Sequence, residues 1–222
     1  EPKGARAAAP LSPDAVRREQ LDNGITVLIQ ENPASASVNV EGYLDAGSNY
    51  DLPECSGRAF LTATMLRRGT LQHAFAECNE ILDGVGASLS LDADHDELGF
   101  WGQSLAEDVD LVLDMLCEML TQPALAQDEM DKLRGQYLTH LGILHSDTGY
   151  RADRAFMEAL YHPTHPYSRP RLGTRESLQA LTRDQVLDYY RQQVHPSTIV
   201  LCIVGAIDAN RVLDRLADTL GR

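Results

Sequence analysis

The chain has 222 residues, of which 43% are hydrophobic and 23% charged, as expected for one folded domain with a sizeable core. Its 33 acidic residues outnumber its 19 basic ones, and the formal net charge of −14 argues against nucleic acid as a partner while allowing a basic protein or peptide. No apolar run approaches the roughly 20 residues that a bilayer-spanning helix needs, so we expect no membrane span.

The first residues differ in composition from the rest. Residues 1–15 are rich in Ala and Pro, which predicts a linker or arm, and residues 16–222 then form the domain. The segment has neither an apolar signal core nor an initiator Met, so we expect a processed chain or a piece cut from a longer one. The cellular compartment stays open.

Six segments carry strand signals. Asn23 and Gly24 both tolerate positive φ. They stand between residues 18–21 and 25–30, two runs that look like strands, and this arrangement predicts a β-hairpin. Alternation of apolar and polar residues, or a short apolar run, predicts the other strands. The expected strands are residues 18–21, 25–30, 38–44, 88–91, 97–103 and 199–204.

Helical spacing of apolar residues marks seven further segments. Thr182 followed by Gln185 forms a capping box that starts one of these helices. The expected helices are residues 57–66, 74–82, 109–120, 130–144, 152–161, 182–193 and 209–220. Strands and helices do not alternate regularly, which favours an α+β fold, a largely antiparallel sheet with helices packed on it.

Several residues are of types that bind metal ions in other proteins. The four cysteines are scattered and form no C-x-x-C pair, so we interpret them as free buried thiols; they are Cys55, Cys78, Cys117 and Cys202. Three histidine-containing groups are further candidates: His162 with His165, His95 with Asp92, Asp94 and Asp96, and His140 with His145 and Asp147. Each group also has an explanation without a metal ion. His162 and His165 lie in a proline-rich loop that offers no third ligand, and His95 lies in a solvated turn between acidic residues. His140 and His145 lie on a helix, where a histidine usually finds local hydrogen-bond partners.

A series of short segments resembles one known family. They are Leu21–Val27, Asp45–Ser48, Ser56–Ala59, Met65, Gly69–Thr70, Gly84–Ala87, His165–Tyr167, Arg169–Thr174 and Ile199–Asp208. Each segment is weak alone, but in this order, over residues 18–220, they resemble the pitrilysin, insulinase and mitochondrial processing peptidase family, the inverted zincins. The resemblance implies a single pitrilysin-type peptidase domain.

The chemistry of that family requires H-x-x-E-H on a helix, where two imidazoles bind zinc and the Glu activates a zinc-bound water. Alignment through Gly57 and Met65 places Phe60 and Thr64 at the ligand positions and Ala63 at the base position. The region of the third ligand falls near residues 139–141, Thr-His-Leu, which contain no Glu. We therefore expect no catalytic residue, no metal site and no cofactor.

The resemblance implies two halves that close around a peptide substrate, with zinc in only one of them in many members. We expect this chain to be a domain of the non-catalytic half, inactive alone, that supports substrate enclosure by a catalytic partner. That partner is a separate zinc peptidase homologue, which makes a heterodimer, or the second half of the same chain. Two alternatives stay open: a structural core subunit of a larger complex, and an enzyme with a relocated site.

Overall fold

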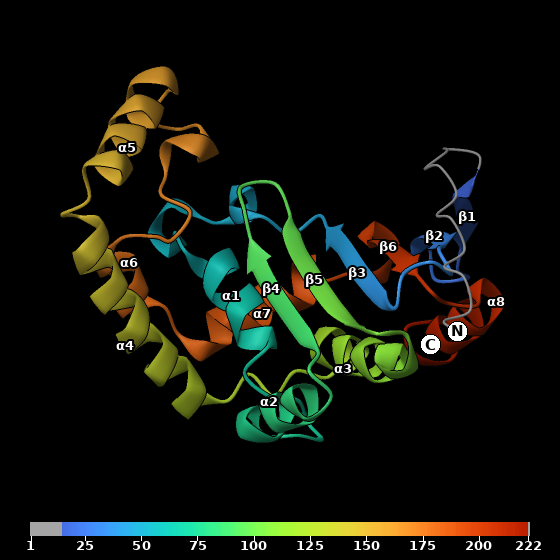
Figure 1. The fold of residues 1–222 in the computed structure, drawn as a ribbon. Coiled ribbons are helices and arrows are strands. Elements are labelled where there is room, and N and C mark those ends of the chain that lie inside the picture. Colours follow the sequence, from blue (N-terminus) through green and yellow to red (C-terminus); the bar gives the residue numbers. More distant parts are fainter. Residues whose placement is uncertain (1–14, 222) are drawn as a thin grey trace.

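The computed structural model describes residues 15–221, and its centre is one six-stranded sheet (Figure 1). The strand order is β1-β2-β6-β3-β5-β4, and only the β2–β6 pair is parallel. The strands are β1 (Arg17–Gln20), β2 (Thr26–Glu31), β3 (Ser37–Leu44), β4 (Ser88–Ala93), β5 (Leu98–Leu105) and β6 (Val200–Gly205). All six predicted strands are present, and the largely antiparallel α+β architecture is confirmed.

The first hairpin forms as predicted. β1 and β2 pair antiparallel with Gln20 opposite Thr26, and Gly24 in the turn has a φ of +96°, which favours glycine. The parallel pairing of β2 with β6 then joins the start of the chain to its last strand. The predicted arm at residues 1–15 lies, except for Ala15, outside the described residues.

Eight α-helices lie within the described residues. They are α1 (Arg58–Leu66), α2 (Phe75–Gly84), α3 (Val109–Thr121), α4 (Gln127–Leu144), α5 (Thr148–Leu160), α6 (Arg175–Ala180), α7 (Arg183–Gln193) and α8 (Ala209–Thr219). Seven were predicted, and Thr182 caps α7 with Gln185 as the capping box requires. The eighth, α6, has only six residues, too few for an apolar period to show in the sequence.

One face of the sheet carries the core. α1 and α2 contact β4, α3 contacts β5, and α8 contacts β2, so these helices cover the same inner face. In β4 the side chains alternate, with Leu89 and Leu91 buried in the core and Ser90 and Asp92 exposed on the outer face. None of the helices described is long and apolar enough to cross a membrane.

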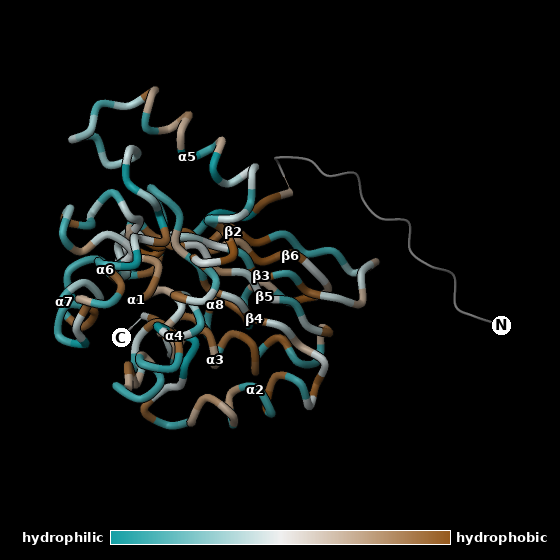
Figure 2. The backbone as a smooth tube through the Cα atoms, turned by 90° about the vertical axis from the view of Figure 1, so that its left-hand side faces the viewer, coloured by the Kyte–Doolittle hydropathy of each residue, from teal (hydrophilic) through white to brown (hydrophobic). Residues whose placement is uncertain are grey.

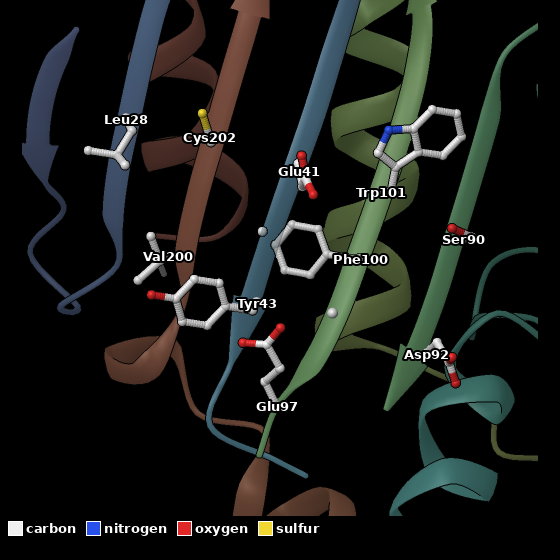
Figure 3. A pocket seen from close by; sticks show the side chains of 12 residues that line it. Leu28, Glu41, Tyr43, Ser90, Asp92, Glu97, Phe100, Trp101, Val200 and Cys202 are labelled. Carbon is white, nitrogen blue, oxygen red and sulfur yellow. The ribbon is translucent and has the colours of Figure 1, made fainter. Parts of the chain in front are cut away.

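The outer face of the sheet is partly apolar and open. Trp101 and Tyr43 are 39% and 44% exposed on it, and with their neighbours they line a shallow groove of about 500 Å³ (Figure 3). Three carboxylates, those of Glu41, Asp92 and Glu97, also line the groove. α4 and α5 lie at the far end of the molecule, where α5 projects away from the sheet (Figures 1 and 2).

Candidate functional site: the motif helix and its surroundings

The motif helix α1 begins at a constrained glycine. Gly57 has a φ of +91°, and a Cβ placed on it would lie 2.7 Å from the carbonyl oxygen of Leu172. The buried carboxylate of Asp51 accepts hydrogen bonds from the N–H groups of Gly57 (2.9 Å) and Ala59 (3.0 Å). A side chain seven residues before the first residue of the helix therefore satisfies two of the N–H groups that a helix start leaves without partners.

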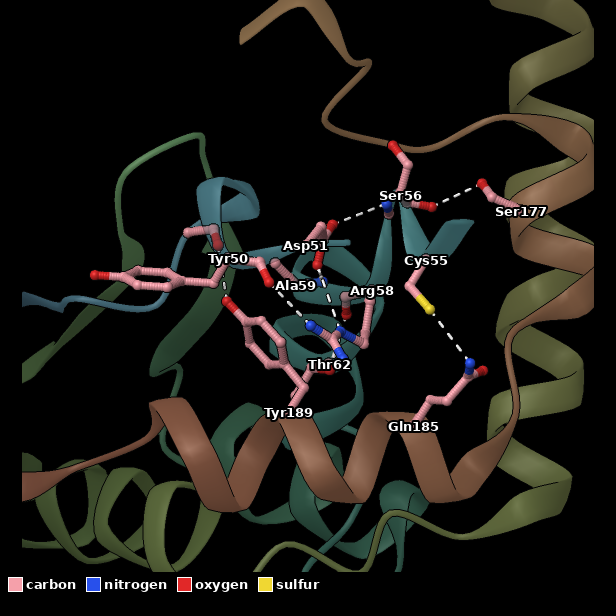
Figure 4. Close-up of polar contacts among 12 residues, drawn as sticks. Tyr50, Asp51, Cys55, Ser56, Arg58, Ala59, Thr62, Ser177, Gln185 and Tyr189 are labelled. Carbon is pink, nitrogen blue, oxygen red and sulfur yellow. Dashed lines mark hydrogen bonds and ion pairs between the residues drawn. The ribbon is translucent and has the colours of Figure 1, made fainter. Parts of the chain in front are cut away.

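Arg58 completes this network from the first position of the helix (Figure 4). Its guanidinium lies 3.6 Å from the Asp51 carboxylate, donates to the Tyr50 carbonyl at 2.9 Å and lies 4.9 Å from the centre of the Tyr189 ring. Burial raises the pKa of Asp51 to about 6, although the Ala59 N–H and the Arg58 charge both lower it. The helix start is thus held by a buried polar cluster.

The motif positions themselves face α4. Phe60 is 8% exposed and Ala63 is fully buried. The Thr64 hydroxyl donates to the Phe60 carbonyl at 3.1 Å and lies 2.7 Å from the hydroxyl of Tyr137 in α4, and the Phe60 and Tyr137 rings are 4.7 Å apart. The α4 side chain that contacts both ligand positions is therefore Tyr137, two to four residues before the expected third-ligand region.

Arg171 covers this aromatic pair from a third segment. Its guanidinium carbon lies 5.2 Å from the centre of the Phe60 ring. Nη1 donates to the Asp92 carboxylate and to the Ala93 carbonyl, both at 2.8 Å. Arg171 thereby fastens the loop before α6 to the end of β4, directly beside the motif helix.

The residues present do not fit a zinc ion. A phenyl ring and a methyl group offer no ligand atoms, and the neutral hydroxyls of Thr64 and Tyr137 are poor ligands. Burial raises the pKa of the Tyr137 phenol, which keeps it protonated. Among residues 15–221, no three His, Cys, Asp or Glu side chains are grouped so that they could hold a metal ion. The side chains at the motif fill the space by packing.

The structure does not gather the candidate histidines at one point: His95 and His140 line a hollow together with Arg171, whereas His162 and His165 lie in the loop after α5. His162 contacts Thr164 at 2.9 Å, and His165 stacks on Tyr161 with ring centres 4.7 Å apart. His95 contacts the Ser48 hydroxyl at 3.0 Å, and burial lowers the pKa of its imidazole. His140 lies in the last turns of α4, and His145 directly follows that helix, where its ring lies edge-on to that of Tyr150.

The cysteines are also dispersed. Cys55, Cys78 and Cys117 are buried and Cys202 is half-buried, and all four are free thiols. Burial raises the pKa of the Cys117 thiol to about 12, which leaves it unreactive as a thiolate.

Reasoning from sequence missed three side chains of this region: Asp51, Tyr137 and Arg171. Asp51 lies outside the motif in sequence, and its role follows only from the turn at residues 52–57. Tyr137 has the spacing of a core residue in an amphipathic helix, and this spacing does not show which residue of α1 it meets. Arg171 was noted only as part of a loop. The only hint in the sequence was that a charged residue precedes each of two helices, Asp51 before α1 and Arg171 before α6.

Comparison with known proteins places the chain in one family. Residues 26–174 match the family described as Insulinase (Peptidase family M16), and residues 180–222 match the Peptidase M16 inactive domain. An uncharacterized zinc protease of Streptomyces coelicolor is 25% identical over 198 residues, 89% of this chain and 43% of that protein. The probable β subunit of the mitochondrial-processing peptidase of Arabidopsis thaliana is 22% identical over 93% of this chain and 39% of its own length.

Solved structures share the fold. The peptidase M16 inactive domain from Pseudomonas fluorescens superposes with a TM-score of 0.85 at 22% identity, over 92% of this chain and 50% of that one. The first half of the periplasmic protease PqqL from Escherichia coli superposes with a TM-score of 0.84 at 22% identity, over 97% of this chain and 47% of that one. The chain spans about half the length of the curated relatives it matches. It belongs to the insulinase family of peptidases, family M16.

Proposed function

We propose that residues 16–222 form a non-catalytic domain that supports substrate enclosure by a catalytic partner half. The observation that carries this proposal is the packed motif: Phe60, Ala63 and Thr64 replace both ligands and the base, and Tyr137 fills the remaining space. A chain with this site needs another polypeptide segment to supply the chemistry. The family membership supports a peptide as the substrate.

The outer face of the sheet supports a partner half. Its groove combines exposed aromatic rings with three carboxylates, which suits a surface that presents apolar side chains and basic groups. The curated relatives are about twice as long as this chain, so a second half of the same length is the partner that these observations favour. That half is either a covalently continuous segment or a separate homologue.

The edge of the sheet supports a role in holding peptide. β4 is the last strand in the sheet order and pairs only with β5 along one side. An exposed strand edge can bind an extended peptide through main-chain hydrogen bonds. Because α1 contacts β4, a peptide added there would run past the motif helix. The domain would then guide substrate without cleaving it.

The test is reconstitution with a family member that carries an intact H-x-x-E-H motif. We expect the mixture to form a complex in sedimentation and to hydrolyse an unstructured peptide faster than the homologue alone. Trp101→Ser, in the groove, should weaken both effects. Leu71→Ser, which changes a more exposed apolar side chain in the loop before α2 (74% exposed, against 39% for Trp101), should leave them unchanged.

Metal content provides an independent check. After dialysis, elemental analysis of the purified chain should find no stoichiometric zinc, and one tightly bound zinc per chain would disprove the non-catalytic role. If the chain contains no zinc, forms no complex and leaves the homologue's activity unchanged, the structural core subunit becomes the better explanation.

A further inference from the structure

A second cavity, away from the sheet, has a charge that contrasts with that of the whole chain. It measures about 470 Å³ and lies between α5, the end of α4 and the segment that leads into α6. Three arginines line it, Arg151, Arg154 and Arg175, against two glutamates, Glu158 and Glu176. In a chain of net charge −14, this local excess of guanidinium groups indicates an anionic ligand.

One of the arginines builds the wall of the cavity. Arg154 has a side chain only 19% exposed, and its Nη2 donates to the Ser168 carbonyl and to the Glu158 carboxylate, both at 2.7 Å. These contacts tie α5 to the loop that follows it. They also neutralise Glu158, which leaves Glu176 as the remaining acidic group of the lining.

The other two arginines are available to a ligand. Within residues 15–221 the guanidinium of Arg151 has no hydrogen bond or ion pair, although its side chain lines the cavity from α5. Arg175 lines the cavity from the start of α6, and its guanidinium has only a 3.5 Å contact with the Leu138 carbonyl. Two guanidinium groups from different helices, with unused donors, suit a carboxylate because its two oxygens can accept from both.

The cavity is also connected to the motif helix. A neighbouring hollow of about 420 Å³ shares Tyr150, Arg154 and Pro170 with it and is lined in addition by Arg171. Arg171 lies over the Phe60 ring and contacts the end of β4. A row of arginines therefore leads from the motif helix and the free edge of β4 to this cavity.

We propose that this cavity binds a carboxylate of an acidic peptide segment, with Arg151 and Arg175 as the groups that contact it. The inference rests on the proposed function, because a peptide held along β4 would extend past Arg171 toward the cavity. The net charge of the chain allowed a basic peptide, whereas the lining of this cavity calls for an acidic one. The molecule as a whole is acidic and carboxylates line the groove on the outer face of the sheet, but the two cavities beside α5 each have at least two arginines in their lining.

The test is fluorescence anisotropy of this chain, alone, with three labelled peptides at matched ionic strength. The first has internal Glu residues and blocked ends, the second is neutral with a free C-terminal carboxylate, and the third has Lys in place of Glu. We expect at least one of the first two to bind, with the pair separating a side-chain from a terminal carboxylate, and the Lys peptide to bind at least about tenfold more weakly. Binding should weaken with added salt.

The variants are charge-matched. Arg151→Gln and Arg175→Gln should each weaken acidic-peptide binding about threefold to tenfold, whereas Arg191→Gln, an exposed arginine on α7, should not. Circular dichroism of each variant establishes that it is folded. Equal binding of all three peptides, or equal weakening by Arg191→Gln, would overturn the proposal, as would full competition by inorganic phosphate at the same ionic strength. Since this assay needs no catalytic partner, its failure and that of the reconstitution experiment are separable.

Discussion

The helices α1 and α5 differ most clearly in how much of each is buried. In α1 every residue except Thr64 is buried, and its first turn is held by Asp51, Arg58 and their partners. In α5 no residue is buried, and Phe156 and Leu160 are 62% and 58% exposed. α1 is therefore almost entirely packed inside the domain, whereas α5 has surface to offer a partner.

The difference has a physical origin. The threonine hydroxyls of α1 are paired inside the protein, as with Thr62, whose hydroxyl donates to the Arg58 carbonyl at 2.8 Å. Removing any partner leaves a buried group unsatisfied, which costs more than the hydrogen bond itself contributes. In α5 most polar side chains reach water, Arg154 apart, so the same change at those positions costs little. Stability should therefore respond to α1 and its cap, and binding to α5.

The largest effect should follow from removing the cap of α1. Asp51→Ala leaves two helix N–H groups and the Arg58 guanidinium without their buried acceptor, so we expect a loss of about 3–5 kcal/mol in the free energy of unfolding. Urea denaturation measures it. Asp208→Ala, which removes the exposed cap of α8, should cost only about 1 kcal/mol. Equal losses in the two variants would show that burial of the α1 cap contributes nothing.

A smaller effect should appear as a pH dependence. The pKa of Asp51 is about 6 in the folded chain and 3.8 in the reference state, so the folded state binds this proton more tightly. The stability that the proton contributes is present below pH 4 and is lost as the pH rises through 6. Relative to Asp51→Asn, which cannot titrate, the natural chain should lose about 2–3 kcal/mol between pH 4 and pH 7.

Urea denaturation of the natural chain and of Asp51→Asn between pH 4 and pH 7 gives the difference in their free energies of unfolding directly, because their other acidic groups are the same. A difference that does not vary with pH would mean that the paired carboxylate keeps an ordinary pKa. In that case the contacts to Ala59 and Arg58 outweigh the cost of burial.

The smallest effect should come from α5. Phe156→Ser removes an apolar side chain that is already mostly in water, so the free energy of unfolding should change by no more than about 0.5 kcal/mol. Thermal or urea denaturation checks it beside Phe60→Ser, in which the buried ring that packs on Tyr137 is lost. A large loss for Phe156→Ser would mean that α5 packs against the body of the domain, contrary to the contrast with α1.

Much of the fold was predictable because its signals are local. Asn23-Gly24 specified a hairpin, the alternation in residues 38–44 specified a strand with one buried face, and Thr182 with Gln185 specified a helix start. The side chains of Phe60, Ala63 and Thr64 likewise offer neither an imidazole nor a carboxylate whatever the structure, because the missing ligand atoms are a property of the residues themselves.

The tertiary structure decided which side chains pack against Phe60 and Thr64. The ring of Phe60 packs against Tyr137 of α4. The choice of that residue depends on the relative rotation and shift of α1 and α4, which are set by packing along the whole length of both helices. The cap from Asp51 and the parallel pairing of β2 with β6 depend on contacts between distant segments. Net charge is a sum over the sequence, whereas the row of arginines near the motif exists only because folding brings Arg151, Arg171 and Arg175 to one side of the molecule.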